Sequence, residues 1–245
     1  MSKAKTLYLI DGSSYIFRAF FGVRQFLSTS TGFPTNALYG FIHMLQKVVK
    51  DEKPDYLAVA FDSKEKTFRH KMYEDYKANR DAPPEDLAKQ FPHFEPLVKA
   101  YNIHGVRVPG FEADDIIGTL AKKAAEEGFK VVIVSGDKDM MQLIGPDISM
   151  LDTMKNKWFG VEEVQEKFGV TPDKVIDVMG LMGDSSDHIP GVKGVGPKTA
   201  SELIRKFNSM HELYERIDEV DKAKLKDKLV QDKELALLSQ KLVTI

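Results

Sequence analysis

The residues in this sequence with the clearest chemical potential are acids that lie where apolar segments end. Three stretches show this pattern, at Asp11, at Asp62 and just after Val134, and further acids open a helical pattern or lie in a glycine-rich turn. The full set is Asp11, Asp62, Glu112, Asp114, Asp115, Asp137, Asp139, Asp184 and Asp187. One such acid alone is usually a turn residue or a helix cap. Repetition at three strand ends and two loops favours a set of ligands instead.

Metal ions are the partners that these acids would require. Ligands of open parallel sheets bind beyond the carboxyl ends of the strands, so acids at those ends should converge. Carboxylates that converge cannot all stay ionised without cations. Oxygen ligands suit hard divalent ions, and we expect two or more Mg²⁺ ions, with Mn²⁺ as a substitute. Two such ions about 3.5–4 Å apart form the usual clamp for displacement at a phosphodiester.

Two of the acidic clusters have a spacing that suggests how they would act. Glu112 and Asp115 lie three residues apart at the start of a helical pattern, on one face of its first turn, and Asp114 projects elsewhere. Asp137 and Asp139 alternate after the segment Val131–Val134, and alternate residues of an extended segment face the same way. We therefore expect two ligand sets, the second of which would include Asp184 and Asp187.

The elements that must position these acids alternate between strand and helix, which predicts an α/β fold with a central, mostly parallel sheet flanked by helices. Strands are expected near residues 6–10, 56–61, 103–108, 130–134 and, at an edge, 148–151. Helices are expected near 35–50, 87–101 and 113–127, the second broken by Pro92 and Pro96. From residue 172 onward the chain is helical and lysine-rich, so we expect a core at 1–171 and a helical subdomain at 172–245.

Composition limits the class of protein. The chain has 245 residues, is 42% hydrophobic and contains no cysteine, which excludes disulfides and thiolate metal sites. No apolar stretch has the length of a membrane span, so we expect a cytoplasmic protein that does not bind membranes. Setting the nine acids aside leaves 28 acids against 35 basic residues, a surplus that suits a polyanionic partner.

Basic residues form two further candidate sites. Lys77 and Arg80, beside Tyr76, would share a helical face and could hold a phosphate, although such faces are more often simply solvated. The segment 191–200 has a Gly-x-Gly turn followed by Pro-Lys-Thr-Ala, which is typical of a helix-hairpin-helix element that binds the DNA backbone through its amides. Its proposed contacts are Lys193, Gly194, Gly196, Lys198 and Thr199.

Taken together, the motifs resemble a known family. Asp11-Gly-Ser-Ser, Arg18-Ala-Phe-Phe, Phe61-Asp62, Thr67-Phe-Arg69 and Tyr76-Lys77 with Arg80 occur in order. They are followed by Glu112-Ala-Asp-Asp115, Ser-Gly-Asp137-Lys-Asp139 and Gly183-Asp-Ser-Ser-Asp187-His-Ile-Pro-Gly. Across nearly the whole chain this resembles the 5′ nuclease domains of bacterial DNA polymerases I and their flap endonuclease relatives. One departure is His188, where that family usually has Asn.

The resemblance implies a helical arch at about 64–96 and a helix-hairpin-helix element at about 180–207. It implies that Asp11, Asp62, Glu112 and Asp114 hold one metal ion. It further implies that Asp114, Asp137, Asp139 and Asp187 hold or approach a second, with Asp115 and Asp184 supporting through water. Lys77 and Arg80 would act on the scissile phosphate, and Arg18 would complete this catalytic set by contacting the substrate nearby. Arg69 and Tyr76 would bind DNA, and a K⁺ ion would bind at the hairpin turn.

The expected activity is hydrolysis of DNA at 5′ ends and flaps during replication and repair. The expected substrate is branched or 5′-flapped duplex DNA, bound by a monomer that works with a polymerase in cis or in trans. Two alternatives stay open. A metal-dependent ribonuclease could share the acidic sheet edge, and a branched-DNA-binding module could retain the acids without catalysis.

Overall fold

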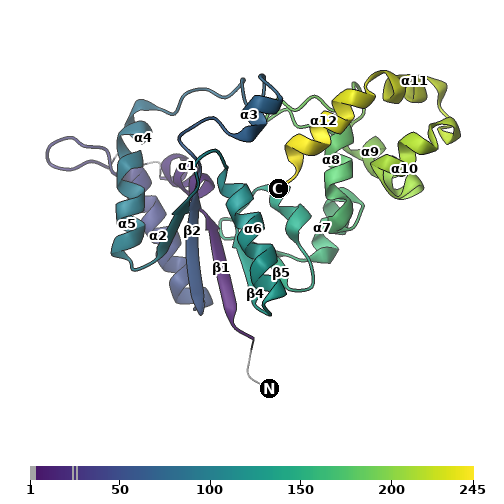
Figure 1. Cartoon of the computed structure of the whole chain (residues 1–245). Coiled ribbons are helices and arrows are strands. Elements are labelled where there is room, and N and C mark those ends of the chain that lie inside the picture. The colour runs from purple at the N-terminus through teal and green to yellow at the C-terminus, as the bar shows by residue number, and fades with distance from the viewer. Residues whose placement is uncertain (1–3, 24, 26) are drawn as a thin grey trace. The chain divides into compact units, whose positions relative to one another are not determined.

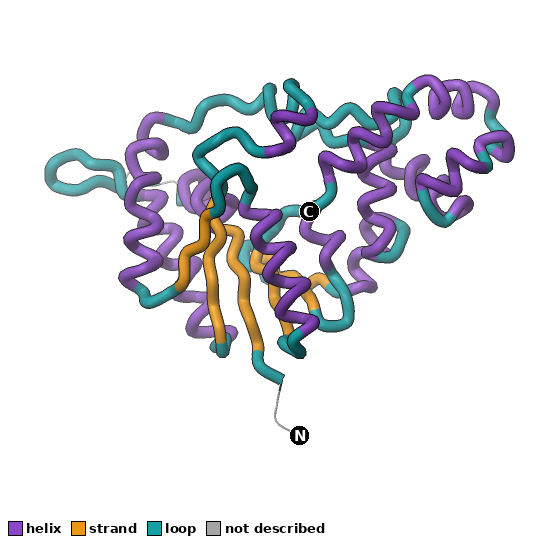
Figure 2. The backbone as a smooth tube through the Cα atoms, viewed as in Figure 1, coloured by secondary structure: helices purple, strands orange, loops and turns teal. Residues whose placement is uncertain are grey.

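The computed structural model describes residues 4–23, 25 and 27–245. These fall into two compact units. Unit 1 comprises residues 1–67, 81–140 and 146–159, and unit 2 comprises residues 68–80, 141–145 and 160–245. Unit 1 contains the whole β-sheet, whereas unit 2 is built from helices and loops (Figure 2).

The sheet of unit 1 has six strands in the order β3-β2-β1-β4-β5-β6. Their bounds are Thr6–Asp11 for β1, Tyr56–Phe61 for β2, His104–Arg107 for β3, Lys130–Val134 for β4, Ile148–Asp152 for β5 and Lys157–Phe159 for β6. All neighbouring pairs are parallel except β5 with β6. The predicted parallel sheet is therefore confirmed, with the carboxyl ends of β1, β2 and β4 along one edge (Figure 1).

Alternation along the central strands explains how both faces of the sheet are covered. Tyr8 and Ile10 of β1 belong to a buried core with Phe41 and Leu45, which come from one helical stripe. The helices on this face are α1 (Gly12–Gly22), α2 (Asn36–Glu52), α4 (Glu85–Gln90) and α5 (Phe94–Ala100). On the opposite face, helix α6 (Ala113–Glu126) packs against β1 and β4.

The expected edge strand at 148–151 is present as β5, but it is not the edge. The three-residue strand β6 pairs with it in antiparallel fashion and forms that edge. Trp158 lies on β6 and is 45% exposed. Three residues are too few for an alternating pattern to be visible in the sequence.

The segment predicted as one helix at 87–101 is divided, as its prolines indicated. Helix α4 is followed by a 3₁₀ turn at Phe91–His93 and then by α5. The only α-helix within residues 64–80, all of which the structure describes, is the five-residue α3 (Phe68–Met72). Lys77 has a φ of 57° in a run of turns, so the helical spacing assumed for Lys77 and Arg80 is wrong.

Unit 2 contains the helices of the C-terminal part. Their bounds are Val161–Phe168 for α7, Val175–Met182 for α8, Pro197–Phe207 for α9, Met210–Glu215 for α10, Ala223–Gln231 for α11 and Lys233–Val243 for α12. Helix α8 packs against both α9 and α12. Pro197 begins α9 at the first helical position, where the missing amide hydrogen costs nothing.

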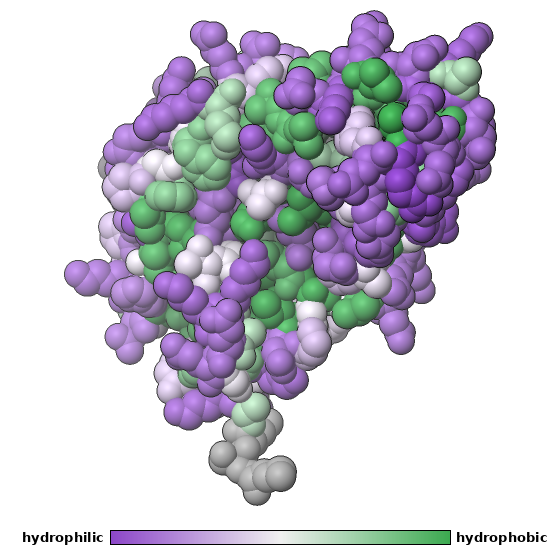
Figure 3. Space-filling model, turned by 45° about the vertical axis from the view of Figure 1, so that its right-hand side comes forward, coloured by the Kyte–Doolittle hydropathy of each residue, from purple (hydrophilic) through white to green (hydrophobic). Residues whose placement is uncertain are grey.

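Hydrophilic residues cover most of the surface visible in Figure 3, with smaller apolar patches between them. Among the described residues, no helix is both long and apolar enough to cross a membrane.

Candidate functional site

Strand register places the first acids of unit 1 side by side. Asp11, the last residue of β1, is aligned with Ala60 of β2, two residues before Asp62. On its other side Ile10 is aligned with Val134, so Asp11 lies beside Ser135. Asp11 thus ends β1, Asp62 directly follows β2, and Asp137 follows β4 by three residues, all at the carboxyl edge of the sheet. The sequence predicted this convergence from the apolar segments alone.

Asp11 is a buried carboxylate, 4% exposed, at the start of α1. One oxygen accepts the Ser14 amide at 2.9 Å, as a helix cap, and the other accepts the Ser135 hydroxyl at 3.0 Å. Burial, reinforced by the charges of Asp62 and Asp137, raises the pKa of Asp11 to about 6. This carboxylate therefore both caps a helix and carries a charge that its surroundings oppose.

The acids around the N-terminus of α6 are tied to its first turn. The Asp62 carboxylate accepts the Ala113 amide at 2.8 Å, and the Ser13 hydroxyl accepts the Asp62 amide at 3.0 Å. Asp115 accepts the Glu112 amide at 2.9 Å, which closes half of a capping box. These acids therefore cap and fix the first turn of α6, and the Glu112 side chain is buried there.

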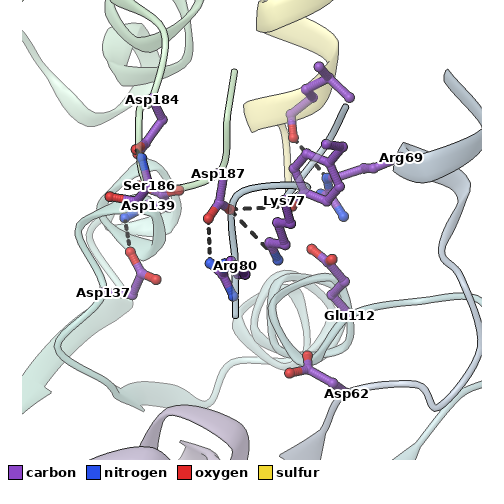
Figure 4. Close-up of polar contacts among 12 residues, drawn as sticks. Asp62, Arg69, Lys77, Arg80, Glu112, Asp137, Asp139, Asp184, Ser186 and Asp187 are labelled. Atoms are coloured by element: carbon purple, nitrogen blue, oxygen red, sulfur yellow. Dashed lines mark hydrogen bonds and ion pairs between the residues drawn. The ribbon is translucent and has the colours of Figure 1, made fainter. Parts of the chain in front are cut away.

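The loop after β4 does not have the extended backbone conformation that we expected. Residues 138–143 form a 3₁₀ helix, and Asp137 accepts the Asp139 amide at 3.0 Å (Figure 4). The prediction that Asp137 and Asp139 alternate along an extended segment is therefore wrong. The Ser135 hydroxyl, which sequence reasoning treated only as part of the turn, also accepts the Asp137 amide at 3.1 Å. Ser135 thereby links this loop to Asp11.

Arg18 supports the same loop. Its guanidinium pairs at 3.3 Å with Asp152, which is 2% exposed, and lies so close to Gly136 that a Cβ there would stand 1.7 Å from a guanidinium nitrogen. A side chain at position 136 would therefore force the Arg18 guanidinium to move. Sequence reasoning missed Asp152 because its partner is 134 residues away. This packing favours a positioning role for Arg18 over the predicted substrate contact.

The donor set of unit 1 fits a hard divalent ion. Its members supply only carboxylate oxygens, and no lysine or arginine of the described residues pairs with Asp11. No three acid or histidine side chains in the described part of the chain are grouped as a ready-made ligand cluster. The fit therefore rests on the chemistry and burial of the donors around Asp11.

In unit 2 a second acid is held by cations. Asp187 pairs with Lys77 at 3.7 Å and with Arg80, and both side chains point toward it (Figure 4). The Asp187 carbonyl also accepts the Lys77 amide at 2.9 Å. The structure thus brings Lys77 and Arg80 together, although through turns and not along a helix.

The turn that carries Asp187 is fixed locally. Asp184 accepts the Ser186 amide at 2.7 Å, and Asp184 and Ile189 exchange backbone hydrogen bonds. His188 has a φ of 57°, a region that Asn tolerates better than His, and its ring nitrogen contacts the Asp75 carbonyl at 3.0 Å. That contact offers a local reason why His can stand at this position.

Two residues predicted to contact DNA lie in the interior of unit 2. Arg69 is 2% exposed, and its guanidinium donates to the carbonyls of Leu242 at 2.8 Å and Thr244 at 2.6 Å. Tyr76 is 4% exposed and its hydroxyl donates to Asp187 at 3.4 Å. This burial favours structural roles for both over contacts with DNA.

The hairpin between α8 and α9 presents its turn to solvent. The residues predicted to bind DNA that are exposed there are Lys193, Gly194, Gly196 and Lys198, while Thr199 is half-buried. The Lys193 amide donates to Asp232 at 2.9 Å, so one of the amides expected to bind phosphate already has a partner. The side chains of Lys193 and Lys198 form no ion pair with an acid among the described residues.

The chain thus combines two features: a parallel sheet with acids at or just after the ends of three adjacent strands, and a helical part with a glycine-rich hairpin. Together they define a class of α/β proteins with acids along the carboxyl edge of the sheet. Models of two families match this chain. The 5′-3′ exonuclease N-terminal resolvase-like domain matches residues 6–169, and the 5′-3′ exonuclease C-terminal SAM fold matches residues 170–245. The chain belongs to the 5′-3′ exonuclease family.

Relatives support this assignment. The chain is 47% identical to DNA polymerase I of Bacillus subtilis, over its whole length but only 28% of that protein. It is 46% identical to the 5′-3′ exonuclease of Aquifex aeolicus, over 85% of this chain and 72% of that one. The chain therefore spans little more than a quarter of the polymerases that it resembles.

Solved structures share the fold. T5 5′-exonuclease with bound zinc has a TM-score of 0.80 at 23% identity, covering 98% of this chain and 89% of that one. The catalytic core of Rad2 in complex with DNA has a TM-score of 0.63 at 16% identity, covering 98% and 78%. Divalent metal ions occupy the first of these proteins and a DNA substrate the second.

Proposed function

We propose that this protein is a divalent-metal-dependent, structure-specific 5′ nuclease that hydrolyses DNA at 5′ ends and flaps. The observation that carries the proposal is the buried Asp11 carboxylate, whose charge is opposed by burial and by Asp62 and Asp137. A cation bound at this edge of the sheet would offset the charge of Asp11. Membership of the 5′-3′ exonuclease family connects that cation to phosphodiester hydrolysis.

The residues that would hold the ions follow from this edge. Asp11, Asp62, Glu112 and Asp114 would hold one Mg²⁺, and Asp137 and Asp139 would contribute to a second. Asp115 would act mainly by fixing the first turn of α6, as its bond to the Glu112 amide indicates. When bound, the ions would activate water and stabilise the charge that develops on the phosphate.

The remaining proposed roles belong to unit 2. Lys77 and Arg80 neutralise Asp187 and would share their charge with a phosphate when DNA binds. The resemblance also assigns Asp184 and Asp187 to metal binding, which an Asp187→Asn variant tests. Lys193 and Lys198 would contact the duplex backbone without reading its sequence, and a K⁺ ion at Gly194 and Gly196 is part of the same proposal.

The proposed organisation is a nuclease core at 1–171, with an arch at about 64–96, and a DNA-binding subdomain at 172–245. Its proposed substrate is branched or 5′-flapped duplex DNA. The similarity to polymerases supports a polymerase partner, in cis or in trans. A monomeric state and a cytoplasmic location remain predictions.

One assay separates this proposal from its alternatives. The protein is incubated with an end-labelled 5′-flap duplex and with single-stranded RNA, each with Mg²⁺ or with a chelator. We expect Mg²⁺-dependent cleavage of the flap that leaves a 5′-phosphate, and little cleavage of RNA. Preferential cleavage of RNA would support the ribonuclease. Tight flap binding without cleavage under any metal condition would support the binding module.

A further inference from the structure

A buried arginine of unit 2 caps the last turn of α12. A helix leaves its final carbonyl groups without partners inside the helix, and that end attracts positive charge. Arg69 of α3 donates to the carbonyls of Leu242 at 2.8 Å and Thr244 at 2.6 Å, and its guanidinium lies at the end of α12 (Figure 4). These bonds span 173 and 175 residues of the chain, so they join α3 to the C-terminal helix.

The same turn of α12 has a second partner in unit 2. The Gln142 side chain donates to the Val243 carbonyl at 2.8 Å and accepts the Ile245 amide at 2.9 Å. Leu242 and Val243 are themselves buried. The end of α12 is therefore fixed by hydrogen bonds from two segments and by burial, and it can serve as a support for α3.

Helix α3 begins the segment that carries Lys77. The Arg69 carbonyl accepts the Tyr73 amide at 2.9 Å, and the Tyr73 carbonyl accepts the Tyr76 amide at 3.1 Å. The Tyr76 ring meets the His70 ring of α3 edge-on, with centroids 5.3 Å apart. The Lys77 ammonium lies 4.9 Å from the centroid of the same Tyr76 ring. Hydrogen bonds and ring contacts therefore lead in a few steps from Arg69 to Lys77.

The far end of this segment has a different kind of support. Asp187 pairs with both Lys77 and Arg80, and these cations would exchange that partner for a phosphate when DNA binds. The bonds of Arg69 go to backbone carbonyls inside unit 2, which a phosphate does not replace. The Arg69 support can therefore hold the segment in place while the cations change partners.

We propose that Arg69 is a positioning residue for cleavage, which places the Lys77 ammonium by holding α3 against the end of α12. Arg69 acts through Lys77 and not by contact with DNA, because its guanidinium is buried and bonded to carbonyls. The proposal rests on the proposed nuclease function, since that function gives Lys77 its part in the cleavage step.

The test is a double-mutant cycle on single-turnover cleavage of a 5′-flap, with flap affinity measured in chelator. Arg69→Gln has a shorter side chain and one amide nitrogen with which to donate, so it cannot hold both carbonyls. It should slow cleavage by about tenfold, less than the roughly 100-fold cost of misplacing a group by about 1 Å, and leave flap affinity unchanged. In a Lys77→Ala background the same change should slow cleavage by less than about twofold, because the group through which Arg69 acts is gone.

A second pair of variants tests the next step of the path and decides the matter even if Arg69→Gln unfolds. His70→Ala keeps the cap on α12 and removes the ring contact with Tyr76. It should slow cleavage by roughly threefold, the size of one edge-to-face contact, and only where Lys77 is present. His70→Phe keeps a ring at this position and should cleave at the wild-type rate. The matched control is Arg216→Gln, since Arg216 follows α10 and pairs with nearby Glu219.

The position of Lys77 can also be followed without cleavage. Reductive methylation with an isotope label gives each lysine an NMR signal, and that of Lys77 is identified by its loss in Lys77→Ala. In chelator and without DNA, Arg69→Gln should shift this signal, because the ammonium moves relative to the Tyr76 ring. The signal of Lys206, which donates to the Glu219 carbonyl, should stay unchanged.

The two proposals fail in different ways. Equal losses from Arg69→Gln and from His70→Ala in both backgrounds, or a flap affinity that falls as much as the rate, would overturn the role of Arg69 even if the wild type cleaves normally. An unshifted Lys77 signal would do the same. A shifted signal in a protein that cleaves no flap would support the link from Arg69 to Lys77 and count against the nuclease.

Discussion

Replacing Asp11 by Asn should stabilise the metal-free protein at neutral pH. The substitution can keep both hydrogen bonds of the side chain at position 11. The new amide oxygen can accept the Ser14 amide, and its NH₂ group can donate to the Ser135 hydroxyl, so both present contacts at 2.9 and 3.0 Å have replacements. What is lost is the buried negative charge.

The magnitude follows from the pKa. Burial raises the pKa of Asp11 from 3.8 to about 6, so ionising this carboxyl group costs more free energy in the folded protein than in the unfolded chain. Below pH 3.8 the group is protonated in both states, so it does not lower the free energy of unfolding. As the pH rises to about 6 the penalty grows, and above that it stays near 3 kcal/mol, since each pH unit corresponds to about 1.4 kcal/mol.

The assay is chemical or thermal unfolding in chelator between pH 3.5 and 8. Asp11→Asn should match the wild type below about pH 4 and exceed it by up to about 3 kcal/mol at pH 7. Mg²⁺ should stabilise the wild type at pH 7 more than the variant. Asp227→Asn, at an exposed position of α11, is the control.

Two results would refute this reasoning. The first is a variant less stable than the wild type at pH 7 in chelator. The second is a stability difference that stays the same below pH 4, because a buried charge cannot act where it is protonated.

Three further predictions concern other positions. Lys77→Ala should slow single-turnover cleavage by about 10²-fold or more while flap affinity changes only a few-fold, and Lys77→Arg should rescue only part; normal cleavage with poor binding would make Lys77 an electrostatic tether. Lys193→Ala with Lys198→Ala should weaken duplex binding for all sequences alike and reduce the salt slope by roughly 0.9 per lost contact; an unchanged slope in binding titrations would contradict this. Gly136→Ala should displace the Arg18 guanidinium from Asp152 and destabilise the protein by about 1 kcal/mol in unfolding experiments, the usual contribution of one hydrogen bond, and Arg18→Ala in the same chain should relieve part of that loss; simple additivity would argue against the close packing.

Local patterns in the sequence were sufficient for the five parallel strands and for the acids that follow them, but not for the short strand β6. A strand buried on both faces is a continuous apolar run, and its end fixes where Asp11 and Asp62 must lie. The 3₁₀ helix after Gly136 and the turns around Lys77 were not predicted, because hydrogen bonds over two or three residues leave no periodic pattern.

Contacts between residues far apart in the sequence could not be predicted either. Arg69 bonds to Leu242, 173 residues away, and no local pattern distinguishes such an arginine from one that binds DNA. Phe17 of α1 and Lys99 of α5 line one groove beside Asp62, although they are far apart in the sequence, and only the folded chain brings them together.

The central claim is that acids at the sheet edge hold the metal ions that hydrolyse DNA. Single-turnover cleavage of a labelled 5′-flap over a range of Mg²⁺ concentrations, with Asp137→Asn beside the wild type and DNA binding measured in parallel, tests it most directly. We predict that Asp137→Asn binds the flap nearly as tightly as the wild type and does not cleave it at any Mg²⁺ concentration. Cleavage by the variant at the wild-type rate with an unchanged Mg²⁺ dependence would contradict the account.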